Sequence, residues 1–392
     1  MRRAYKFRMR PTARQHVALA ACVDSHRELY NAALQERRDA WGQNKTRICY
    51  TDQAAQLSEI REERTDVALW SYASQQATLR RLNRAFDAFF RRVKAGETPG
   101  YPRFKGRARF ESVEWPRDAD GCRWHPDTSR VYLQGIGRVK VSAHRMVAGR
   151  VKTLQVRREG RHWMLVLSCD DVPPRPLPGT GRPVGIDVGI ASFATTSDGQ
   201  HVENPRWART AASKLAAAQR RLQRARRGSK NRQRRLETVA ARHRKVANQR
   251  RSFHHKIARQ FIERYEVIVV EDLAIANMLR RAKPVADPDN RGAFLANGAK
   301  AKSGLSRSIS DAGWGQFVSV LRAKAEDAGR TWIEVDPRHT SDGCEHCGYA
   351  AAENRVTQAE FVCRACGHSA QADEHAARNI LWAGLALHAQ PA

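Results

Sequence analysis

The sequence predicts a multidomain protein in which an all-β and helical first part precedes an α/β second part. Three observations indicate this organisation. Short alternating apolar runs fill residues 101–171, a proline- and glycine-rich segment follows at 173–182, and apolar strands with acids at their ends lie beyond it among long helices. At roughly 150 residues per domain, a chain of 392 residues has room for two or three folded units.

The chain is strongly basic, with 70 Lys and Arg residues against 40 Asp and Glu and a formal net charge of +30. Such an excess favours nucleic acid as the partner over a membrane surface or a heparin-like ligand, and it argues against an ordinary metabolic enzyme. The apolar runs are shorter than half of the ~20 residues that a spanning helix needs. We therefore expect a cytoplasmic bacterial protein that joins the nucleoid when it binds DNA, with no membrane partner.

The first part begins with an alternating strand at residues 5–9 and a helix that opens at Pro11-Thr12. A second helix carries an apolar stripe over residues 79–93, so residues 11–97 are predicted to form a helical lobe. The alternating runs predict a small β-barrel or sandwich over residues 98–172, which the strand within residues 1–10 could complete.

The second part begins after the predicted linker at 173–182. An apolar strand at 184–190 is interrupted by an acid, two long helices over 211–265 break at Gly228-Ser229, and a buried strand at 267–270 runs into Glu271. Residues 280–312 show no periodicity and are expected to form a mobile loop.

Order resumes with a predicted helix over 315–328 and a strand over 331–335. A cluster of cysteines follows, and a terminal helix is expected over about 373–388.

Two CxxCG pairs form the strongest local signal, and they contain Cys344, Cys347, Cys363 and Cys366. Four thiolates with no open position specify a structural Zn²⁺, which predicts a zinc ribbon over residues 341–369. His346 and His368 remain alternative ligands, and four unrelated free thiols remain the alternative to a metal site.

Three acids lie in or beside buried elements: Asp187 in a strand, Glu271 at a strand end, and Asp373 at the start of the last helix. A bare carboxylate in a buried element costs free energy unless a metal or partner compensates it. Together the three could bind two Mg²⁺ ions for phosphodiester cleavage. The alternatives are a helix N-cap for Asp373, an ion pair with arginine for Asp187 and a solvated charge for Glu271.

A second strand at 193–197 is followed by Asp198-Gly199, which predicts a tight hairpin. The order of strands, hairpin, helices and acids matches an RNase H-like fold.

The two helices predicted over residues 211–265 carry many Lys and Arg residues. These positive charges would repel one another unless a polyanion neutralises them, so we expect nucleic-acid contacts there. The residues proposed for these contacts are Arg220, Arg221, Arg224, Arg227, Lys230, Arg234 and Arg235. In the first part the corresponding candidates are Lys105 and the polar residues Ser74, Gln75 and Thr78, which could face a DNA groove.

The chain resembles the TnpB family, proteins of bacterial insertion sequences related to compact CRISPR type V effectors. The resemblance rests on short motifs whose order and spacing are shared along nearly the whole chain. They include Tyr5–Arg8, Pro102–Lys105, Gly185–Ile190, Val270–Leu273, both CxxCG pairs and Asn379-Ile380.

This resemblance implies an RNA-guided, Mg²⁺-dependent DNA endonuclease. A guide RNA from the transposon end would direct one RuvC-like site, formed by Asp187, Glu271 and Asp373, to double-stranded DNA beside a short flanking motif. It also implies a RuvC-like nuclease domain over residues 183–340 and 370–392, with the zinc ribbon inserted in it. The first part would be a wedge-type barrel carrying a helical recognition lobe, and no obligate protein partner is expected. The alternatives are a nuclease-impaired RNA-guided repressor and a transposase that acts on element ends.

Two departures from the family pattern flank Asp373. Gln371 stands where the family usually has Asp, and His375 stands where it usually has Asn. We expect them to affect metal affinity or rate rather than the type of reaction.

Overall fold

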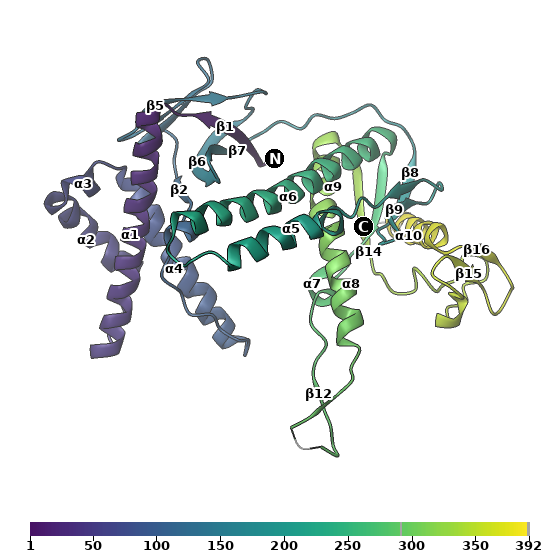
Figure 1. Cartoon of the computed structure of the whole chain (residues 1–392). Helices are drawn as coiled ribbons and strands as arrows, with labels where there is room; N and C mark the ends of the chain where they lie inside the picture. The colour runs from purple at the N-terminus through teal and green to yellow at the C-terminus, as the bar shows by residue number, and fades with distance from the viewer. Residues whose placement is uncertain (291, 390–392) are drawn as a thin grey trace. The chain divides into compact units, whose positions relative to one another are not determined.

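The computed structural model describes residues 1–290 and 292–389 and divides into two compact units (Figure 1). Unit 1 extends from Met1 to Pro173 and unit 2 begins at Pro174. The division falls in the proline-rich segment, where few side chains can contribute to a core.

Unit 1 is built on a seven-stranded antiparallel sheet of order β2-β6-β7-β1-β5-β4-β3. Its strands are β1 (Arg3–Arg10), β2 (Ser112–Trp115), β3 (Cys122–His125), β4 (Arg130–Leu133), β5 (Gly137–Ser142), β6 (Arg150–Glu159) and β7 (His162–Asp170). The first strand pairs with β5 and β7, so it joins the sheet as expected. Within the described residues β2 and β3 are not paired with each other, so this sheet is an open one rather than the closed barrel that was one of the two expectations.

The helices of unit 1 are α1 (Ala13–Asn44), α2 (Tyr50–Glu63), α3 (Thr65–Ala68) and α4 (Tyr72–Lys94). The first helix begins where expected because Thr12 and Gln15 form a capping box: each side chain accepts a hydrogen bond from the other's backbone nitrogen. The predicted apolar stripe of α4 supplies buried Leu79, Leu82 and Phe86 to the core.

The expectation that Ser74, Gln75 and Thr78 face a DNA groove is wrong for this structure. Their exposed fractions are 0%, 1% and 4%. Ser74 Oγ lies 2.8 Å from His26 Nε2, Gln75 donates to the carbonyl of Val67, and Thr78 donates to the carbonyl of Ser74. Buried polar groups are normally hydrogen-bonded. The hydrogen bonds of these three side chains stabilise the start of α4 within unit 1.

Unit 2 contains a mixed five-stranded sheet of order β10-β9-β8-β11-β14. Its strands are β8 (Pro183–Asp187), β9 (Ser192–Thr196), β10 (His201–Glu203), β11 (Val267–Glu271) and β14 (Thr331–Val335). The central strands β8, β11 and β14 are parallel, and β8, β9 and β10 form an antiparallel meander. This order agrees with the expected series of strands, while the RuvC assignment itself stays a prediction.

The helices of unit 2 are α5 (Trp207–Gln223), α6 (Lys230–Arg264), α7 (Ile275–Met278), α8 (Ala299–Ala312), α9 (Trp314–Ala328) and α10 (Ala372–Ala389). The expected break between the two long helices is confirmed, and Gly228 adopts a φ of 80° there. None of the helices in the described part of the chain is long and apolar enough to cross a membrane.

Helices cover the two faces of the unit 2 sheet. On one face, α6 and α9 lie side by side (Figure 1) and bury Phe261 and Phe317 with Ile268 of β11. On the other face, Ile380 of α10 packs against Val269. Alternate residues of β11 therefore face the two layers, as a strand buried on both sides requires.

The expectation of a loop over residues 280–312 is wrong for its second half. A two-stranded hairpin of β12 (Val285–Ala286) and β13 (Phe294–Leu295) is followed by α8. This helix anchors itself through Ile309 and Ala312, which are 1% and 4% exposed. Its remaining residues are mostly small and polar, so the apolar periodicity that would predict a helix is weak.

Candidate active site and metal centre

Asp187 and Glu271 lie at the carboxyl ends of neighbouring parallel strands. The register pairs Val270 with Ile186, which places the next residue of each strand side by side. Asp187 is the last residue of β8 and does not interrupt the strand. The carboxyl edge of a parallel sheet is a common place for binding and catalytic groups.

Asp373 reaches the same edge because α10 lies very close to β8. A Cβ at Gly185 would lie 2.1 Å from the carbonyl oxygen of Ala377, so only glycine permits this approach. Asp373 precedes Ala377 by one helical turn. Gln371 caps the helix by accepting a hydrogen bond from Glu374 N at 2.7 Å, and Asp373 is thereby not needed as the N-cap.

Electrostatic interactions connect Asp187 with the other two acids. The pKa of Asp187 is raised to about 7, first by burial and then by the negative charges of Glu271 and Asp373. Burial also raises the pKa of Glu271, against a hydrogen bond from Thr340 that lowers it. Two carboxylates that raise the proton affinity of a third make this edge of the sheet a place where a cation would be stabilising.

Two residues that sequence reasoning missed contact these acids. Arg355 Nη2 lies 3.2 Å from Asp373 Oδ1, and Thr340 Oγ1 donates to Glu271 Oε1 at 2.6 Å. The charge of Arg355 also lowers the pKa of Asp187. Both residues lie in irregular segments near the cysteine pairs, where no periodicity marks a position as buried or paired.

The segment before the first cysteine pair is bound to α10. Asn379 Nδ2 donates to the carbonyls of Thr340 and Gly343 at 3.0 and 2.8 Å. The His375 Nε2 atom lies 2.8 Å from the same Gly343 oxygen, and its ring stacks on Phe361 at 3.8 Å. His375 therefore faces the cysteine segment, so any influence on the acids has to pass through that segment.

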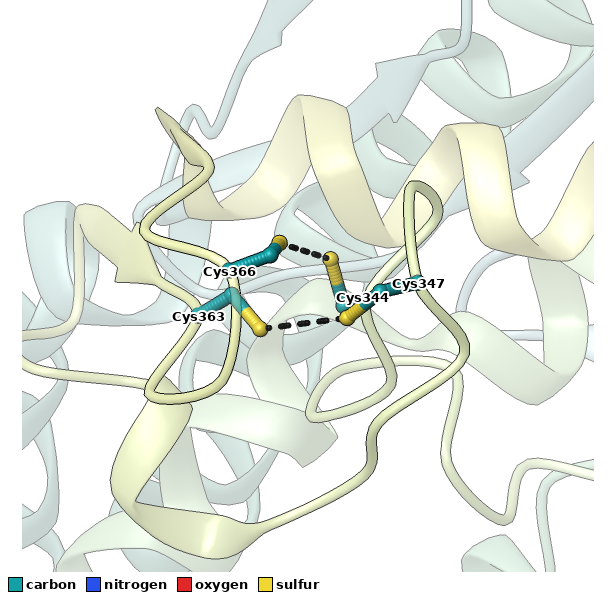
Figure 2. A group of neighbouring side chains, drawn as sticks. All are labelled: Cys344, Cys347, Cys363 and Cys366. Carbon is teal, nitrogen blue, oxygen red and sulfur yellow. Dashed lines mark hydrogen bonds between the residues drawn. The ribbon is translucent and has the colours of Figure 1, made fainter.

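The four cysteines form one cluster (Figure 2). Cys344 Sγ lies 3.7 Å from Cys366 Sγ, and Cys347 Sγ lies 3.6 Å from Cys363 Sγ. Four sulfurs at about 2.3 Å from one tetrahedral ion would be separated by roughly 3.8 Å, so the cluster can bind zinc.

The two histidines near the cysteines do not complete this cluster. His368 Nε2 lies 3.1 Å from Glu345 Oε1, and the rings of His346 and His368 have centroids 4.5 Å apart. Glu345, His368 and His375 gather as a second group, but Arg378 already neutralises Glu345 at 2.9 Å. This group is a polar network that joins the ribbon to α10.

The ribbon has almost no apolar core of its own. Its only regular structure within the described residues is a short 3₁₀ turn and the hairpin of β15 (Glu360–Val362) and β16 (Ser369–Gln371). Its small core contains Phe361 with Cys344, Cys363 and Ala372. A metal at the cysteines would therefore supply much of the stability of this segment.

The basic pair α5 and α6 presents most of its predicted contact residues to solvent. Arg220, Arg221, Arg224, Arg227, Lys230 and Arg234 are exposed. Arg235 is half-buried and donates to the carbonyl of Arg221. In unit 1, Lys105 is half-buried with its Nζ atom 5.8 Å above the ring centroid of Tyr30.

A cavity of about 1330 Å³ in unit 2 was not foreseen from the sequence. Several cations from α5, α8 and the segment after α7 line it, and we call it the basic groove: Arg206, Arg209, Arg281, Lys302 and Arg307. Ile190 and Leu279, three and eight residues beyond Asp187 and Glu271, also line it. The cavity is therefore lined in part by the segments that follow β8 and β11.

A sheet edge with three carboxylates, a four-cysteine cluster beside it and a cationic groove define a nucleic-acid-binding protein with an acidic centre suited to divalent metals. Residues 166–282 match a family described as "Probable transposase", and residues 314–380 match "Cas12f1-like, TNB domain". The chain is 32% identical to the "Putative RNA-guided DNA endonuclease InsQ" of Escherichia coli (strain K12), over 98% of this chain and 92% of that protein. The chain belongs to the TnpB family.

Other relatives have related descriptions. A "Putative RNA-guided DNA endonuclease" of Streptomyces pristinaespiralis is 32% identical, over 99% of this chain and 91% of that protein. The "CRISPR-associated endodeoxyribonuclease Cas12f1" of Sulfoacidibacillus thermotolerans is 28% identical, over 64% of this chain and 57% of that protein. Among solved structures, CasPhi-2 bound to crRNA gives 12% identity and a TM-score of 0.46, with 98% of each chain covered.

Residues 1–46 match a family described as "Helix-turn-helix domain". In the structure these residues contain the strand β1 and the single long helix α1. A strand that joins the unit 1 sheet occupies the place of a first helix, so this segment has no helix-turn-helix geometry.

Proposed function

We propose that this protein is an RNA-guided DNA endonuclease of a transposable element. It cuts double-stranded target DNA beside a short flanking motif. The observation that carries the proposal is the convergence of Asp187, Glu271 and Asp373 in a chain that matches an RNA-guided DNA endonuclease along 98% of its length.

The three acids are the proposed ligands of Mg²⁺, with two ions as the expected number. Hard divalent cations prefer carboxylate oxygens, and the mutual repulsion of these acids is relieved by positive charge. Two such ions would activate the attacking water and stabilise the leaving oxygen of the phosphodiester.

The chain's own residues prepare this site. Thr340 holds Glu271 in place through its 2.6 Å hydrogen bond, and the Gly185 contact fixes the position of α10. Arg355 balances the charge of Asp373. If cations took over the charge of the acids, the Arg355 guanidinium could instead donate to a non-bridging oxygen of a substrate phosphate.

We assign zinc to the cysteine cluster, with a structural role. Four thiolates leave no open position for catalysis. The ribbon that zinc would hold carries Arg355 and is preceded by Thr340, so the zinc would act on cleavage by ordering groups that contact the acids.

The cationic surfaces account for the nucleic-acid partners. A guide RNA derived from the transposon end would supply sequence specificity, and the protein would hold the RNA–DNA duplex by its backbone. The exposed arginines of α5 and α6 suit phosphate contacts, and the basic groove suits a DNA strand on its way to the acids. Unit 1 would serve as the wedge-type sheet with its helical recognition lobe.

The remaining assignments follow from this function. Unit 2, with the ribbon inserted in it, would be a RuvC-like nuclease domain. We place the protein in the bacterial cytoplasm, on the nucleoid when it is bound to DNA, and we assign it no obligate protein partner.

The test is cleavage of a plasmid that carries a target matching the bound RNA. Asp187→Ala, Glu271→Ala and Asp373→Ala should each abolish cleavage while leaving RNA and target binding intact. Asp127→Asn, at an exposed position of unit 1, is the matched control and should cut like the parent protein. Target binding without cleavage in the parent protein would instead identify an RNA-guided repressor, and strand joining at element ends would identify a transposase.

A further inference from the structure

A second cavity lies within unit 1, between the end of α1, the segment that follows it and the last turns of α4. Its volume is about 870 Å³. Sites for small molecules occupy roughly 300–1,000 Å³. All of its lining residues belong to unit 1, and none has a role in the site described above.

The walls of this cavity are unusually aromatic. Trp41, Phe89, Phe90 and Tyr101 line it together with the more deeply buried Phe86. The Tyr101 ring lies 5.3 Å from that of Phe89 and 5.6 Å from that of Phe86, edge-on to both. Their contacts hold the rings in fixed positions.

Three of these rings leave large areas exposed. Trp41 is 57% exposed, Phe90 48% and Tyr101 43%. Large aromatic side chains grouped on one surface commonly mark a binding site, whereas core packing would cover them. Lys45 Nζ lies 6.0 Å from the centroid of the Trp41 ring, and the remaining exposed aromatic surface is available to a flat apolar ligand.

A buried cation at the cavity offers an unused donor. Arg37 is 7% exposed, and its Nε and Nη1 atoms donate to Gln53 and Asn83 at 2.9 and 3.2 Å. Its Nη2 atom is buried and has no hydrogen-bond partner in the described part of the chain. Such a donor favours a ligand that brings an acceptor, because an unsatisfied buried N–H group destabilises the fold.

The rim of the cavity is cationic. Arg47, Arg91 and Lys94 line it, all are exposed, and among the described residues none forms an ion pair. Among the described residues that line the cavity, Asp87 is the one acid, and it accepts a hydrogen bond from Asn83. The rim therefore suits a ligand that carries several negative charges outside a flat apolar group.

We propose that this cavity binds an unstacked nucleobase of single-stranded nucleic acid, with the adjacent phosphates on the rim cations. Stacking platforms beside cations are the usual means by which proteins hold single strands. The proposal rests on the proposed function in one respect: an RNA-guided enzyme that opens DNA has unpaired RNA bases and unpaired DNA bases within reach. An apolar peptide fits less well because it would bring no anions to Arg47, Arg91 and Lys94.

The test measures binding of short labelled single strands to the full chain without guide RNA, at one fixed salt concentration. The probes are an RNA strand, a DNA strand and a DNA strand of abasic sites. The variants are Trp41→Leu and Phe90→Leu, with Phe90→Tyr to keep the ring. Tyr132→Leu, at a 40% exposed aromatic of β4 outside the cavity, is the matched control. The exposed position of Trp41 makes its variant safe for folding, which circular dichroism checks.

The two leucine variants should bind base-containing strands roughly five- to 150-fold more weakly, the usual range for loss of one stacked base. Phe90→Tyr and Tyr132→Leu should bind as the parent does, and the abasic strand should not distinguish the variants. A loss confined to RNA or to DNA identifies the source of the base. Equal affinities for all variants, or an equal loss with the abasic strand, would overturn the proposal. This experiment measures binding and not cleavage. Its result can therefore be interpreted even if the protein proves not to be a nuclease.

Discussion

The guanidinium of Arg355 lies 3.2 Å from the carboxylate of Asp373, although the two residues are 18 positions apart in the sequence. The contact joins the inserted ribbon to the acidic centre. Together with the hydrogen bond from Thr340 to Glu271, it makes the cysteine segment part of the structure around the proposed catalytic acids. Charge balance and geometry at the acids therefore depend on the folding of the ribbon.

Removal of Arg355 should separate metal binding from cleavage. In Arg355→Ala the acids lose a neighbouring positive charge, so Mg²⁺ should bind at least as tightly. The rate constant for cleavage should fall about 10²- to 10³-fold if the guanidinium stabilises charge on the phosphate. Arg355→Lys should recover part of the rate. Arg338→Ala, at a side chain that is 84% exposed, is the control and should change neither quantity. A parallel loss of metal affinity would show that Arg355 only maintains the fold.

The acid trio should make stability depend on pH in the absence of divalent metal. The pKa of Asp187 is raised from 3.8 to about 7 in the folded protein, so the folded state binds more protons than the unfolded state between these values. Stability should therefore fall as pH rises from about 4 through 7. Asp187→Asn removes this charge and should stabilise the metal-free protein by roughly 1–3 kcal/mol at pH 8, with little gain at pH 4.

Thermal unfolding at the two pH values measures this effect. Addition of Mg²⁺ should raise the melting temperature of the parent protein at pH 8 and should raise that of Asp187→Asn much less, because a ligand stabilises the state that binds it. A melting temperature of the parent that is independent of pH over this range would contradict the proposed convergence of charge.

Loss of the ribbon metal should inactivate the enzyme without unfolding unit 2. Cys344→Ser should release zinc, measured by elemental analysis, and should abolish cleavage because Arg355 and Thr340 lose their positions. Cys49→Ser, outside the cluster, should keep both zinc and activity. Stoichiometric zinc and full cleavage in Cys344→Ser would contradict the assignment.

The arginines at the end of α5 and directly after it should contribute to the affinity for nucleic acid without a preference for its sequence. Changing Arg220, Arg221 and Arg224 to Gln should weaken RNA binding and reduce the slope of log affinity against log salt by roughly 0.7 for each phosphate that the protein no longer neutralises. Asn231→Ala with Gln233→Ala, two exposed positions at the start of α6, is the control. An unchanged slope would remove these arginines from the interface.

The sequence predicted the parts of this site that regular structure carries. Asp187 stands out because an acid interrupts an apolar run, and Glu271 because an acid ends one. The spacing of the cysteine pairs indicates a metal on its own. Arg355 and Thr340 could not be predicted, because their positions depend on how an irregular ribbon folds back on α10. The departure at Gln371 has an explanation that depends on the folded structure, since its side chain caps α10.

The errors have equally physical causes. Ser74 and its polar neighbours on α4 were expected at the surface, but specific hydrogen bonds pair them inside unit 1. The helix α8 was missed because it is composed of small and polar residues and buries little beyond Ile309 and Ala312. Tertiary contacts decide the structure where periodicity is weak.

The most direct test of the central claim is to purify the protein expressed with its flanking locus, sequence the RNA bound to it, and incubate the complex with matched and mismatched plasmids in Mg²⁺ or in a chelator. We expect one discrete RNA and double-strand cleavage of the matched plasmid only, dependent on the metal. Equal cleavage of the matched and mismatched plasmids would contradict the proposed function. So would a protein that carries no defined RNA and cleaves neither plasmid.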